Sequence, residues 1–291
     1  MKKILITGAD SYIGVSVEDY LSLFEGEYLI HTLDMKSPSW RDFDFSGYDS
    51  VFHVAGIAHS DSGKISAEKE KLYYAVNTDL TLECAKKAKQ SGVPQFIFMS
   101  SAIVYGESAP IGREKLITRD TPPAPNNCYS NSKLLAEKGL LELQDGDFGV
   151  VILRPPMIYG KNSKGNYPLL SKMAGRLPFF PRVNNRRSVL YVGNLCEFVR
   201  LMIENRERGI FHPANSGDIT TSTLVASIGQ IKGRKIRLVR GFTWALKLLS
   251  FFTPLVDKAF GSLAYDPGIS EYKENYRKYS LEESLRLTEG E

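Results

Sequence analysis

The first half of the chain alternates short apolar runs with polar turns that contain glycine. The runs at 4–6, 28–33, 51–54 and 96–99 have the length of strands, and their continuous apolar character is typical of strands buried on both faces. The segment 66–91 instead repeats apolar residues every four positions, which predicts a helix. The residues at this spacing are Val76, Leu80, Cys84 and Ala88. Strands that alternate with helices predict an α/β fold with a parallel sheet.

The first predicted strand ends in a turn with the spacing Gly-x-x-Ser-x-x-Gly. Gly8 permits a sharp turn, Gly14 permits the next helix to pack closely on the strand, and the free N–H groups of that helix favour a pyrophosphate. Ser11 replaces the middle glycine of a three-glycine pattern, so an ordinary strand–helix turn stays an alternative. The residues expected to bind a dinucleotide here are Gly8, Asp10, Ser11, Tyr12, Ile13 and Gly14.

The second run ends in Asp34, which lies 20 residues after Gly14. A carboxylate at this distance accepts hydrogen bonds from the adenine ribose hydroxyls and repels a 2′-phosphate, so it favours NAD over NADP. Lys36 weakens this preference, and a solvated acid at a strand end is the alternative.

The third run ends in small residues that allow a cofactor to approach the backbone: Val54, Ala55 and Gly56. His53, within this run, is interpreted as a core histidine whose hydrogen bonds are satisfied. Asn77, on the predicted helix, has two possible uses: it ties the helix to a neighbouring strand, or it contacts the cofactor.

The fourth run ends in Ser100 and Ser101, and ligands of an open parallel sheet lie beyond the carboxyl ends of its strands. A helix predicted to start near Asn127 carries Tyr129 and Lys133 one turn apart on one face. The ammonium can therefore act on the phenol. A Tyr–Lys pair at this spacing is common by chance, so its position after the other elements is what makes it informative.

Composition agrees with one compact α/β enzyme, since the chain has 291 residues with 24% charged and 43% hydrophobic positions. Three cysteines are too few for a disulfide framework and lack metal-ligand spacing, so we expect no metal and a reducing compartment. The N-terminus runs directly into a strand and no apolar run could span a bilayer, which predicts a cytoplasmic protein.

A net charge of +4 is too small and dispersed to indicate nucleic-acid binding. The locally basic segment 232–240 is interpreted as an edge strand with one solvated face, and attraction of an acidic ligand or surface is the alternative. The segment 242–256 is apolar nearly all round. We expect its burial in the C-terminal lobe, with a dimer contact or a membrane-surface helix as alternatives.

Together these elements resemble the extended short-chain dehydrogenases/reductases, specifically the nucleotide-sugar epimerases and dehydratases. Further segments carry the resemblance: Ser100 to Gly106, Leu153 to Pro156, and Arg187 leading into Val189 to Val192. The resemblance implies NAD as cofactor, with Asn77, Tyr129, Lys133 and Pro156 also contacting it. It implies Ser101, Tyr129 and Lys133 as catalytic residues, and Ser101, Tyr129, Asn166 and Arg187 as substrate contacts. A homodimer is also expected.

The implied chemistry needs a base that takes a hydroxyl proton while a hydride leaves a sugar carbon. Free tyrosine has a pKa of about 10, so we expect the Lys133 ammonium and the positive nicotinamide ring to lower the pKa of Tyr129. Ser101 is expected to hydrogen-bond the reacting oxygen and to fix its distance from Tyr129.

Three reactions are considered. The 4,6-dehydratases of the family carry an Asp-Glu pair after the catalytic serine or threonine, but this chain has Ala102 and Ile103, so dehydration is disfavoured. Asp34 favours a 4-epimerase with tightly held NAD, and an NAD(P)H-dependent 4-ketoreductase is the alternative. A non-catalytic protein that binds NAD or sugar nucleotides is a second alternative.

The predicted architecture is a doubly wound parallel Rossmann sheet with a smaller C-terminal substrate-binding lobe. NAD binding is assigned to 1–155, with 188–216 returning to that domain, and nucleotide-sugar binding to 156–291. The predicted substrate is a UDP-hexose or UDP-N-acetylhexosamine. Met157 stands where galactose-type epimerases carry an asparagine, so the sequence leaves the sugar open.

Overall fold

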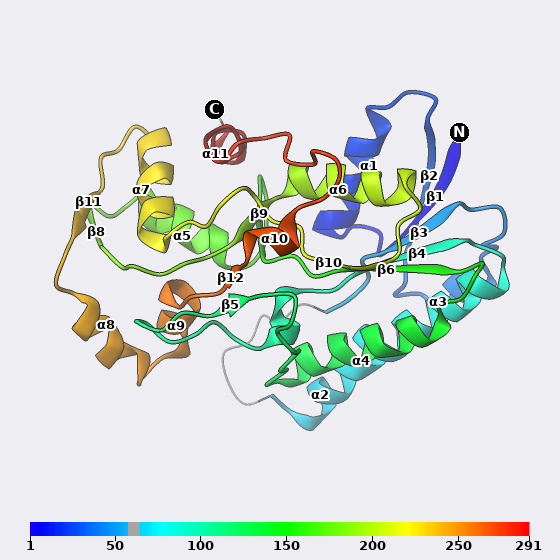
Figure 1. Ribbon diagram of the computed structural model, residues 1–291, viewed down its shortest axis with the longest axis horizontal. Helices are drawn as coiled ribbons and strands as arrows, with labels where there is room; N and C mark the ends of the chain where they lie inside the picture. The colour runs from blue at the N-terminus through cyan, green and yellow to red at the C-terminus, as the bar shows by residue number, and fades with distance from the viewer. Residues whose placement is uncertain (58–64, 291) are drawn as a thin grey trace. The chain divides into compact units, whose positions relative to one another are not determined.

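The computed structural model describes residues 1–57 and 65–290, which fold into two compact units (Figure 1). Both units are built from segments that are separated in the sequence. Unit 1 consists of Met1–Gly106, Pro123–Arg154 and Leu195–His212, and unit 2 consists of Glu107–Pro122, Pro155–Asn194 and Pro213–Glu291.

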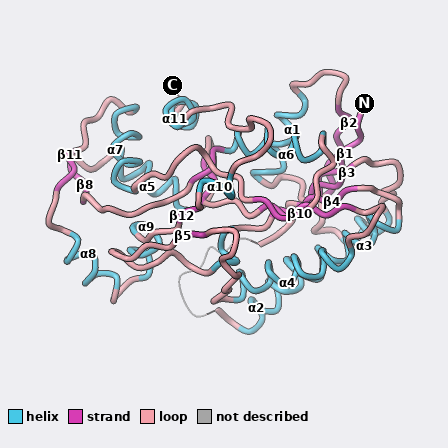
Figure 2. The backbone as a smooth tube through the Cα atoms, viewed as in Figure 1, coloured by secondary structure: helices cyan, strands magenta, loops and turns pink. Residues whose placement is uncertain are grey.

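Unit 1 is organised around a six-stranded sheet in the order β10-β6-β4-β3-β1-β2, drawn in magenta in Figure 2. The strands are β1 (Lys2–Thr7), β2 (Tyr28–Leu33), β3 (Ser50–His53), β4 (Gln95–Met99), β6 (Gly149–Leu153) and β10 (Gly209–Phe211). Every neighbouring pair is parallel. All residues of β3, β4 and β6 are buried, which explains their near-continuous apolar sequences.

Helices cover both faces of this sheet. Figure 1 shows α1 (Tyr12–Ser22) and α6 (Val192–Glu204) on one side, and α2 (Ala67–Tyr74), α3 (Leu80–Gln90) and α4 (Cys128–Leu143) on the other. Short turns of 3-10 helix form η1 (Pro38–Asp42) and η3 (Ala102–Tyr105). This arrangement confirms the predicted doubly wound parallel sheet. The helix predicted over 66–91 is present but contains a π turn, η2 (Ala75–Asp79), between α2 and α3.

The order of the strands predicts where a ligand binds. The chain leaves β1 for β2 on one side and then returns to β3 on the other, which creates a topological switch point at the carboxyl ends of β1 and β3. Gly8 lies at this point with φ +106°, and a Cβ on it would come within 2.7 Å of the Ala55 backbone nitrogen. Only glycine fits there, so the two strand ends meet closely.

Unit 2 contains three short pairs of parallel strands and six helices among its described residues. The strand pairs are β7 (Met157–Tyr159) with β9 (Val189–Tyr191), β8 (Phe179–Pro181) with β11 (Arg237–Val239), and β5 (Leu116–Ile117) with β12 (Ala264–Tyr265). The helices are α5 (Asn166–Ala174), α7 (Thr221–Ile231), α8 (Thr243–Ser250), α9 (Pro254–Phe260), α10 (Pro267–Ser270) and α11 (Leu281–Glu289). Their core includes Tyr159 and Tyr167, whose rings stack with centroids 5.2 Å apart.

One apolar segment departs from the expected burial. Within α8 only Leu246 is buried, whereas Trp244 and Leu248 are exposed, as are Phe251 and Phe252 directly after the helix. The expectation that 242–256 is buried is therefore wrong for this stretch, because α8 packs through one narrow face and turns the other outward.

Candidate active site

The turn after β1 is shaped by residues that the sequence analysis assigned to a dinucleotide. Asp10 adopts a left-handed conformation with φ 63°, and Ser11 then caps α1 by accepting a hydrogen bond from the Gly14 backbone N–H at 3.1 Å. A Cβ on Gly14 would lie 2.5 Å from the Ser11 hydroxyl oxygen. Ser11 therefore replaces a glycine without opening the turn, since its side chain satisfies one of the helix N–H groups.

Asp34 follows β2, at the position expected for a ribose contact. Its carboxylate accepts a hydrogen bond from the Lys36 backbone N–H at 3.0 Å, which fixes the start of the following loop. A cavity of about 260 Å³ lies beside this loop, and its walls include Met35, Trp40 and Val76. Charged residues line the same cavity: Lys36, Arg41, Asp79 and Glu83. Its apolar part, next to the loop that follows Asp34, would suit a flat ring such as adenine.

The end of β3 is packed against α4 through Asn77. Its side-chain oxygen accepts from the Ile57 backbone N–H at 2.8 Å, and its amide nitrogen donates to the Ser132 hydroxyl at 3.1 Å. A Cβ on Gly56 would lie 3.1 Å from the Asn77 oxygen and 3.2 Å from the Lys133 ammonium nitrogen. Asn77 thus has the first of its two predicted uses, as a tie between β3, η2 and α4.

His53 is a core residue, as predicted. The Thr7 hydroxyl and the Thr81 hydroxyl hydrogen-bond its two ring nitrogens at 2.7 and 3.1 Å. Burial lowers the pKa of His53 to about 3, and the nearby Lys133 adds to this shift. The imidazole is therefore neutral at physiological pH and has no free nitrogen for chemistry.

Ser101 and Tyr129 are brought together at the carboxyl end of β4. Ser101 caps η3, Tyr129 lies in the first turn of α4, and Ser101 is near enough to the phenol to influence its pKa. Burial nevertheless raises the pKa of Tyr129 to about 12, although donation by Ser101 favours the phenolate. The phenol therefore stands beside the hydroxyl partner that the sequence analysis assigned to it.

Lys133 lies one turn further along α4 and is buried. Its ammonium donates to the Met99 carbonyl at 2.9 Å and lies 4.6 Å from the centre of the Phe98 ring. Burial lowers the pKa of Lys133 to about 8, with Glu137 opposing the shift. The expected lowering of the Tyr129 pKa by Lys133 is wrong for the protein alone, because desolvation raises this pKa and Lys133 is not among the groups that shift it. When NAD is bound, the positive charge of its oxidised nicotinamide ring would favour the phenolate.

A buried polar network beside these residues was not recognised as part of the site. Glu137, one further turn along α4, accepts from the Ser100 hydroxyl and forms a buried ion pair with Arg154, whose Nη2 lies 2.6 Å from its Oε2. Arg154 also donates to the Tyr105 hydroxyl at 2.7 Å, and this hydroxyl lies 2.7 Å from His212 Nε2. The sequence signal for Glu137 was the repeat of polar residues at 129, 133 and 137 on one helix face, whereas Ser100, Tyr105 and Arg154 lie in segments that carry the family resemblance.

This network holds the residue that precedes Ser101. Ser100 is bound through its side chain to Glu137 and through its backbone N–H to the Leu153 carbonyl at 2.8 Å. The end of β4 is therefore tied both to α4 and to β6. We infer that the ion pair positions Ser101 relative to Tyr129, although it does not itself touch the reacting atoms.

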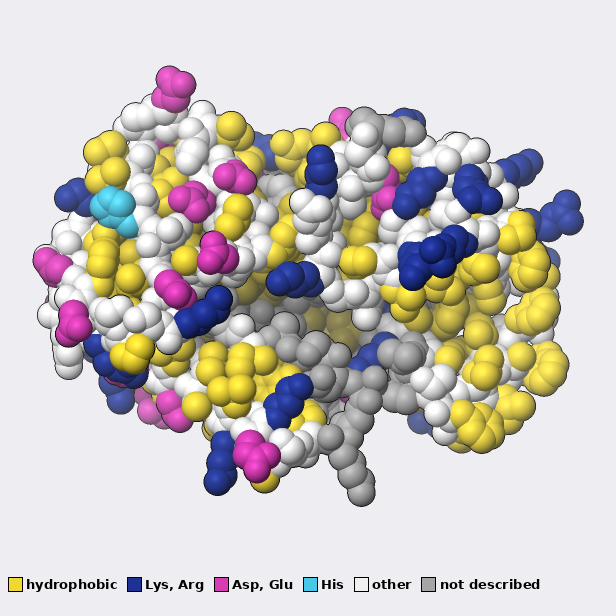
Figure 3. Space-filling model, turned by 180° about the vertical axis from the view of Figure 1, so that it is seen from behind, with side chains coloured by type: hydrophobic (Ala, Val, Ile, Leu, Met, Phe, Trp, Pro, Cys, Tyr) yellow, Lys and Arg dark blue, Asp and Glu magenta, His cyan; other side chains and the backbone are white. Residues whose placement is uncertain are grey.

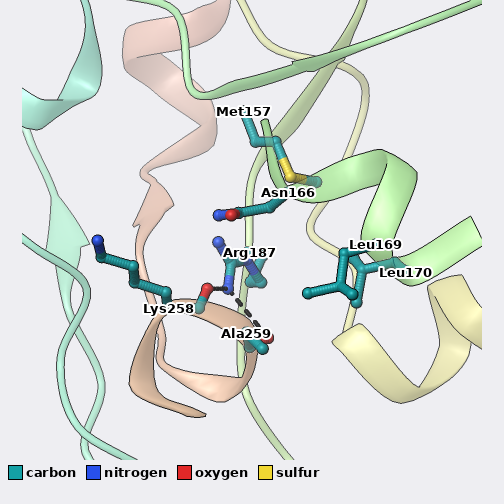
Figure 4. Close-up of a pocket in the computed structure, with 7 residues that line it drawn as sticks. All are labelled: Met157, Asn166, Leu169, Leu170, Arg187, Lys258 and Ala259. Carbon is teal, nitrogen blue, oxygen red and sulfur yellow. Dashed lines mark hydrogen bonds between the residues drawn. The ribbon is translucent and has the colours of Figure 1, made fainter. Parts of the chain in front are cut away.

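In unit 2, two of the predicted substrate-binding residues line one small cavity (Figure 4). Asn166 and Arg187 line it together with Met157, the residue noted for its departure from galactose-type epimerases. The guanidinium of Arg187 donates to the carbonyls of Lys258 and Ala259 at 2.7 and 3.1 Å. Burial lowers the pKa of Arg187 to about 10.

Arg187 lacks a carboxylate partner among the residues that the structure describes. Only backbone oxygens accept its hydrogen bonds there, and the second cation beside it, Lys258, lines the same cavity. A partly buried guanidinium without a counter-ion is unfavourable unless an anion binds it. Pro156, which directly precedes β7 in the sequence, also belongs to unit 2 and is buried.

Residues 4–214 match the model of the NAD dependent epimerase/dehydratase family. The chain belongs to this family. Membership confirms the predicted enzyme class and NAD as its cofactor. The turn after β1, Asp34 and Lys133 are the residues of this epimerase/dehydratase that would hold NAD.

Two curated relatives are named as 4-epimerases. A UDP-glucose 4-epimerase of Vibrio cholerae is 29% identical, over 94% of this chain and 89% of its own. N-acetyl-α-D-glucosaminyl-diphospho-ditrans,octacis-undecaprenol 4-epimerase of Escherichia coli O157:H7 is 30% identical, over 70% of this chain and 60% of its own.

Solved structures share the fold at lower identity. A dTDP-4-dehydrorhamnose reductase of Clostridium acetobutylicum superposes with a TM-score of 0.75 and 18% identity, covering 98% of both chains. A UDP-glucuronic acid 4-epimerase of Bacillus cereus with bound NAD gives a TM-score of 0.72 and 16% identity, covering 99% of this chain and 97% of that one. These matches support the Rossmann architecture of this family member.

Proposed function

We propose that this chain is an NAD-dependent 4-epimerase of a hexose carried on a diphosphate, with a UDP-hexose or UDP-N-acetylhexosamine as the substrate. The observation that carries the proposal is the placement of three residues at the carboxyl end of β4: Ser101 caps η3, Tyr129 lies in the first turn of α4, and Lys133, one turn further, donates to the Met99 carbonyl at 2.9 Å. The two curated relatives described above support the position of the reaction on the sugar, since both are named as 4-epimerases.

Each residue has a defined part in this proposal. Tyr129 takes the proton of the C4 hydroxyl and later returns it, while Ser101 hydrogen-bonds the same oxygen and stabilises charge as the carbonyl forms. NAD, when bound, would supply the oxidation at C4 and the reduction that follows, with the hydride delivered to the opposite face of the sugar. Lys133 would bind the cofactor ribose and would keep a positive charge on the helix that carries Tyr129. Proton and hydride are both restored, so no net oxidant is consumed.

Arg187 is assigned to the diphosphate of the substrate. Its forked guanidinium matches phosphate oxygens, and the diphosphate would supply the anion that the described residues do not provide. The E. coli relative is named for a sugar on a polyprenyl diphosphate, which offers the same diphosphate to an arginine. We propose that the sugar is carried on a nucleotide, and the experiment below also assays a sugar carried on a lipid.

The deciding experiment incubates the purified protein, without added cofactor, with UDP-glucose, UDP-N-acetylglucosamine and a polyprenyl-diphosphate-linked N-acetylglucosamine. Interconversion of a UDP-sugar with its galacto epimer supports the proposal, whereas conversion of the lipid-linked sugar alone moves the substrate to the lipid carrier. Consumption of NADPH with a 4-keto sugar would make the chain a ketoreductase. Tight binding of NAD or a UDP-sugar without turnover would make the chain a non-catalytic binding protein.

Tyr129→Phe tests the mechanism. Loss of the proton-transfer group should lower turnover by about 10²–10⁴-fold, while bound NAD, measured by absorbance and mass spectrometry, is retained. Tyr28→Phe is the control, because Tyr28 donates to Glu204 at 2.6 Å and takes no part in the site. Full activity of Tyr129→Phe would remove the mechanism.

A further inference from the structure

The exposed stretch 242–252 gathers large apolar side chains on the surface of unit 2. Trp244 is 71% exposed, Leu248 55%, Phe251 85% and Phe252 81%. Phe242 and Leu249 are also exposed, whereas the other exposed large apolar residues are spread over the rest of the described chain. Scattered residues of this kind need no explanation, but a cluster marks an interaction surface.

The geometry of α8 directs these residues to one side. Leu246 points inward and is 9% exposed, while Trp244, Leu248 and Phe251 follow one another at helical spacings of four and three. Figure 3 shows hydrophobic side chains gathered on this side of the molecule, with Lys and Arg side chains beside them. The segment therefore has a large apolar outer face, to which Trp244 contributes within α8 and Phe251 directly after it.

Along the sequence, the charged residues of this region are all basic. Positions 219–256 contain no Asp or Glu, and their basic residues are Lys232, Arg234, Lys235, Arg237, Arg240 and Lys247. Lys232 is paired with Glu289, but Arg240 and Lys247 form no ion pair with any residue that the structure describes. Arg182 and Arg240 also line a cavity of about 440 Å³ that includes Thr243, the first residue of α8. Cations therefore border the apolar face.

We propose that the exposed face of 242–252, together with Arg182, Arg240 and Lys247, binds the surface of an anionic phospholipid bilayer. The aromatic and leucine side chains enter the interface and the cations bind lipid phosphates. No helix in the described parts of the chain is long and apolar enough to cross a membrane, so the contact is peripheral. The proposal does not depend on the catalytic one.

A second copy of the chain is the rival occupant, and the charge argues against it. In a two-fold symmetric dimer the same patch meets itself, so Arg240 and Lys247 of both copies would approach one another. Juxtaposed like charges oppose such a contact, whereas an anionic surface neutralises them.

The test uses the full-length protein with vesicles of phosphatidylglycerol and phosphatidylcholine, and with vesicles of phosphatidylcholine alone. The chain has two tryptophans, and Trp40 is 1% exposed, so Trp244 reports the contact. Its emission should shift to shorter wavelength on the anionic vesicles, and the protein should sediment with them. Trp244→Phe should keep sedimentation but lose the spectral shift.

Two sets of variants separate the apolar and electrostatic parts. Phe251→Ser with Phe252→Ser should weaken anionic vesicle binding by at least about tenfold, because each aromatic side chain loses its transfer into the apolar interface. Arg240→Gln and Lys247→Gln should each weaken it by about fivefold and reduce its salt dependence. Leu23→Ser with Leu287→Ser is the matched control, since both leucines are exposed outside the patch.

Two results would overturn the proposal. The first is equal sedimentation with and without anionic vesicles at low salt. The second is a dimer in sedimentation velocity that the Phe251→Ser, Phe252→Ser variant dissociates, which would assign the patch to a second copy. Circular dichroism and thermal unfolding of each variant establish that it remains folded.

Discussion

Each unit shields one arginine from solvent, and the two are balanced in different ways. Arg154 in unit 1 is buried, and Glu137 holds it through three hydrogen bonds of 2.6 to 3.2 Å. Burial alone would lower the pKa of Arg154, but the bonds to Glu137 and Tyr105 raise it. Arg187 in unit 2 is bound by two backbone carbonyls, and burial lowers its pKa to about 10.

The difference supports the roles proposed for the two residues, with Arg154 as a structural cation and Arg187 as a ligand-binding one. Arg154 is neutralised within the fold, so its role is to hold the ends of β4 and β6 and the helix α4 in one arrangement. Arg187 keeps a positive charge that the described residues do not neutralise. A fold that retains such a charge loses stability for it, which is expected where binding requires a preorganised site.

The largest expected effect comes from breaking the balanced pair. Glu137→Gln leaves the buried guanidinium of Arg154 without its counter-ion, so we expect the free energy of unfolding to fall by about 3–5 kcal/mol. Turnover should fall as well, because Ser100 loses its anchor. Urea unfolding measures the first effect and the epimerase assay the second.

Two further variants control this prediction. Glu142→Gln changes an exposed carboxylate on the same helix and should leave the unfolding free energy within about 0.5 kcal/mol. Glu137→Leu combined with Arg154→Met removes both charges and should recover most of the lost stability. An unchanged unfolding curve for Glu137→Gln would remove the distinction drawn between the two arginines.

The next effect concerns the unbalanced arginine. Arg187→Met removes charge-assisted bonds to a diphosphate, each worth about 1.5–3 kcal/mol, so kcat/KM should fall by about 10²-fold with little loss of stability. Steady-state kinetics and urea unfolding measure the two responses separately. Arg186→Met is the matched control, since Arg186 is a half-exposed neighbour that pairs with Asp218 at 2.8 Å. Equal kinetic losses in both variants would contradict the assignment of Arg187.

The smallest effect comes from Lys133, the second buried cation of unit 1. Burial lowers the pKa of Lys133 to about 8, against about 10.4 in an unfolded chain. Between these values the unfolded state binds more protons, so the stability of the wild type rises with pH. Lys133→Met removes the buried charge, so its Tm should exceed that of the wild type at pH 8. This difference in Tm should therefore become smaller between about pH 8 and pH 10, as thermal unfolding measures.

The exposed Lys138→Met on the same helix is the control for this comparison. A Tm difference between Lys133→Met and the wild type that stays constant from pH 7 to pH 10 would show that Lys133 is not held as a buried ammonium. Lys133 and Arg154 would then differ less in the direction of their pKa shifts than the structure indicates.

Local patterns were enough to predict the sheet and the position of the site. Strands buried on both faces must be continuously apolar, so β3 and β4 were visible as runs, and their carboxyl ends indicated where ligands bind. Tyr129 and Lys133 were recognisable because four residues make about one helical turn. The π turn at η2 had no such signal, since its sequence continues the helical pattern.

The sequence alone determined which residues share a strand or a helix face and which chemistry they can carry. Tertiary structure decided which charges are neutralised: Glu137 meets Arg154 across 17 positions, and Tyr105 meets His212 across 107. It also decided that 242–252 is exposed and that desolvation dominates the pKa of Tyr129. Both outcomes depend on what packs against a side chain, and burial sets the free energy of a charge or an apolar surface more strongly than the identity of the residue does.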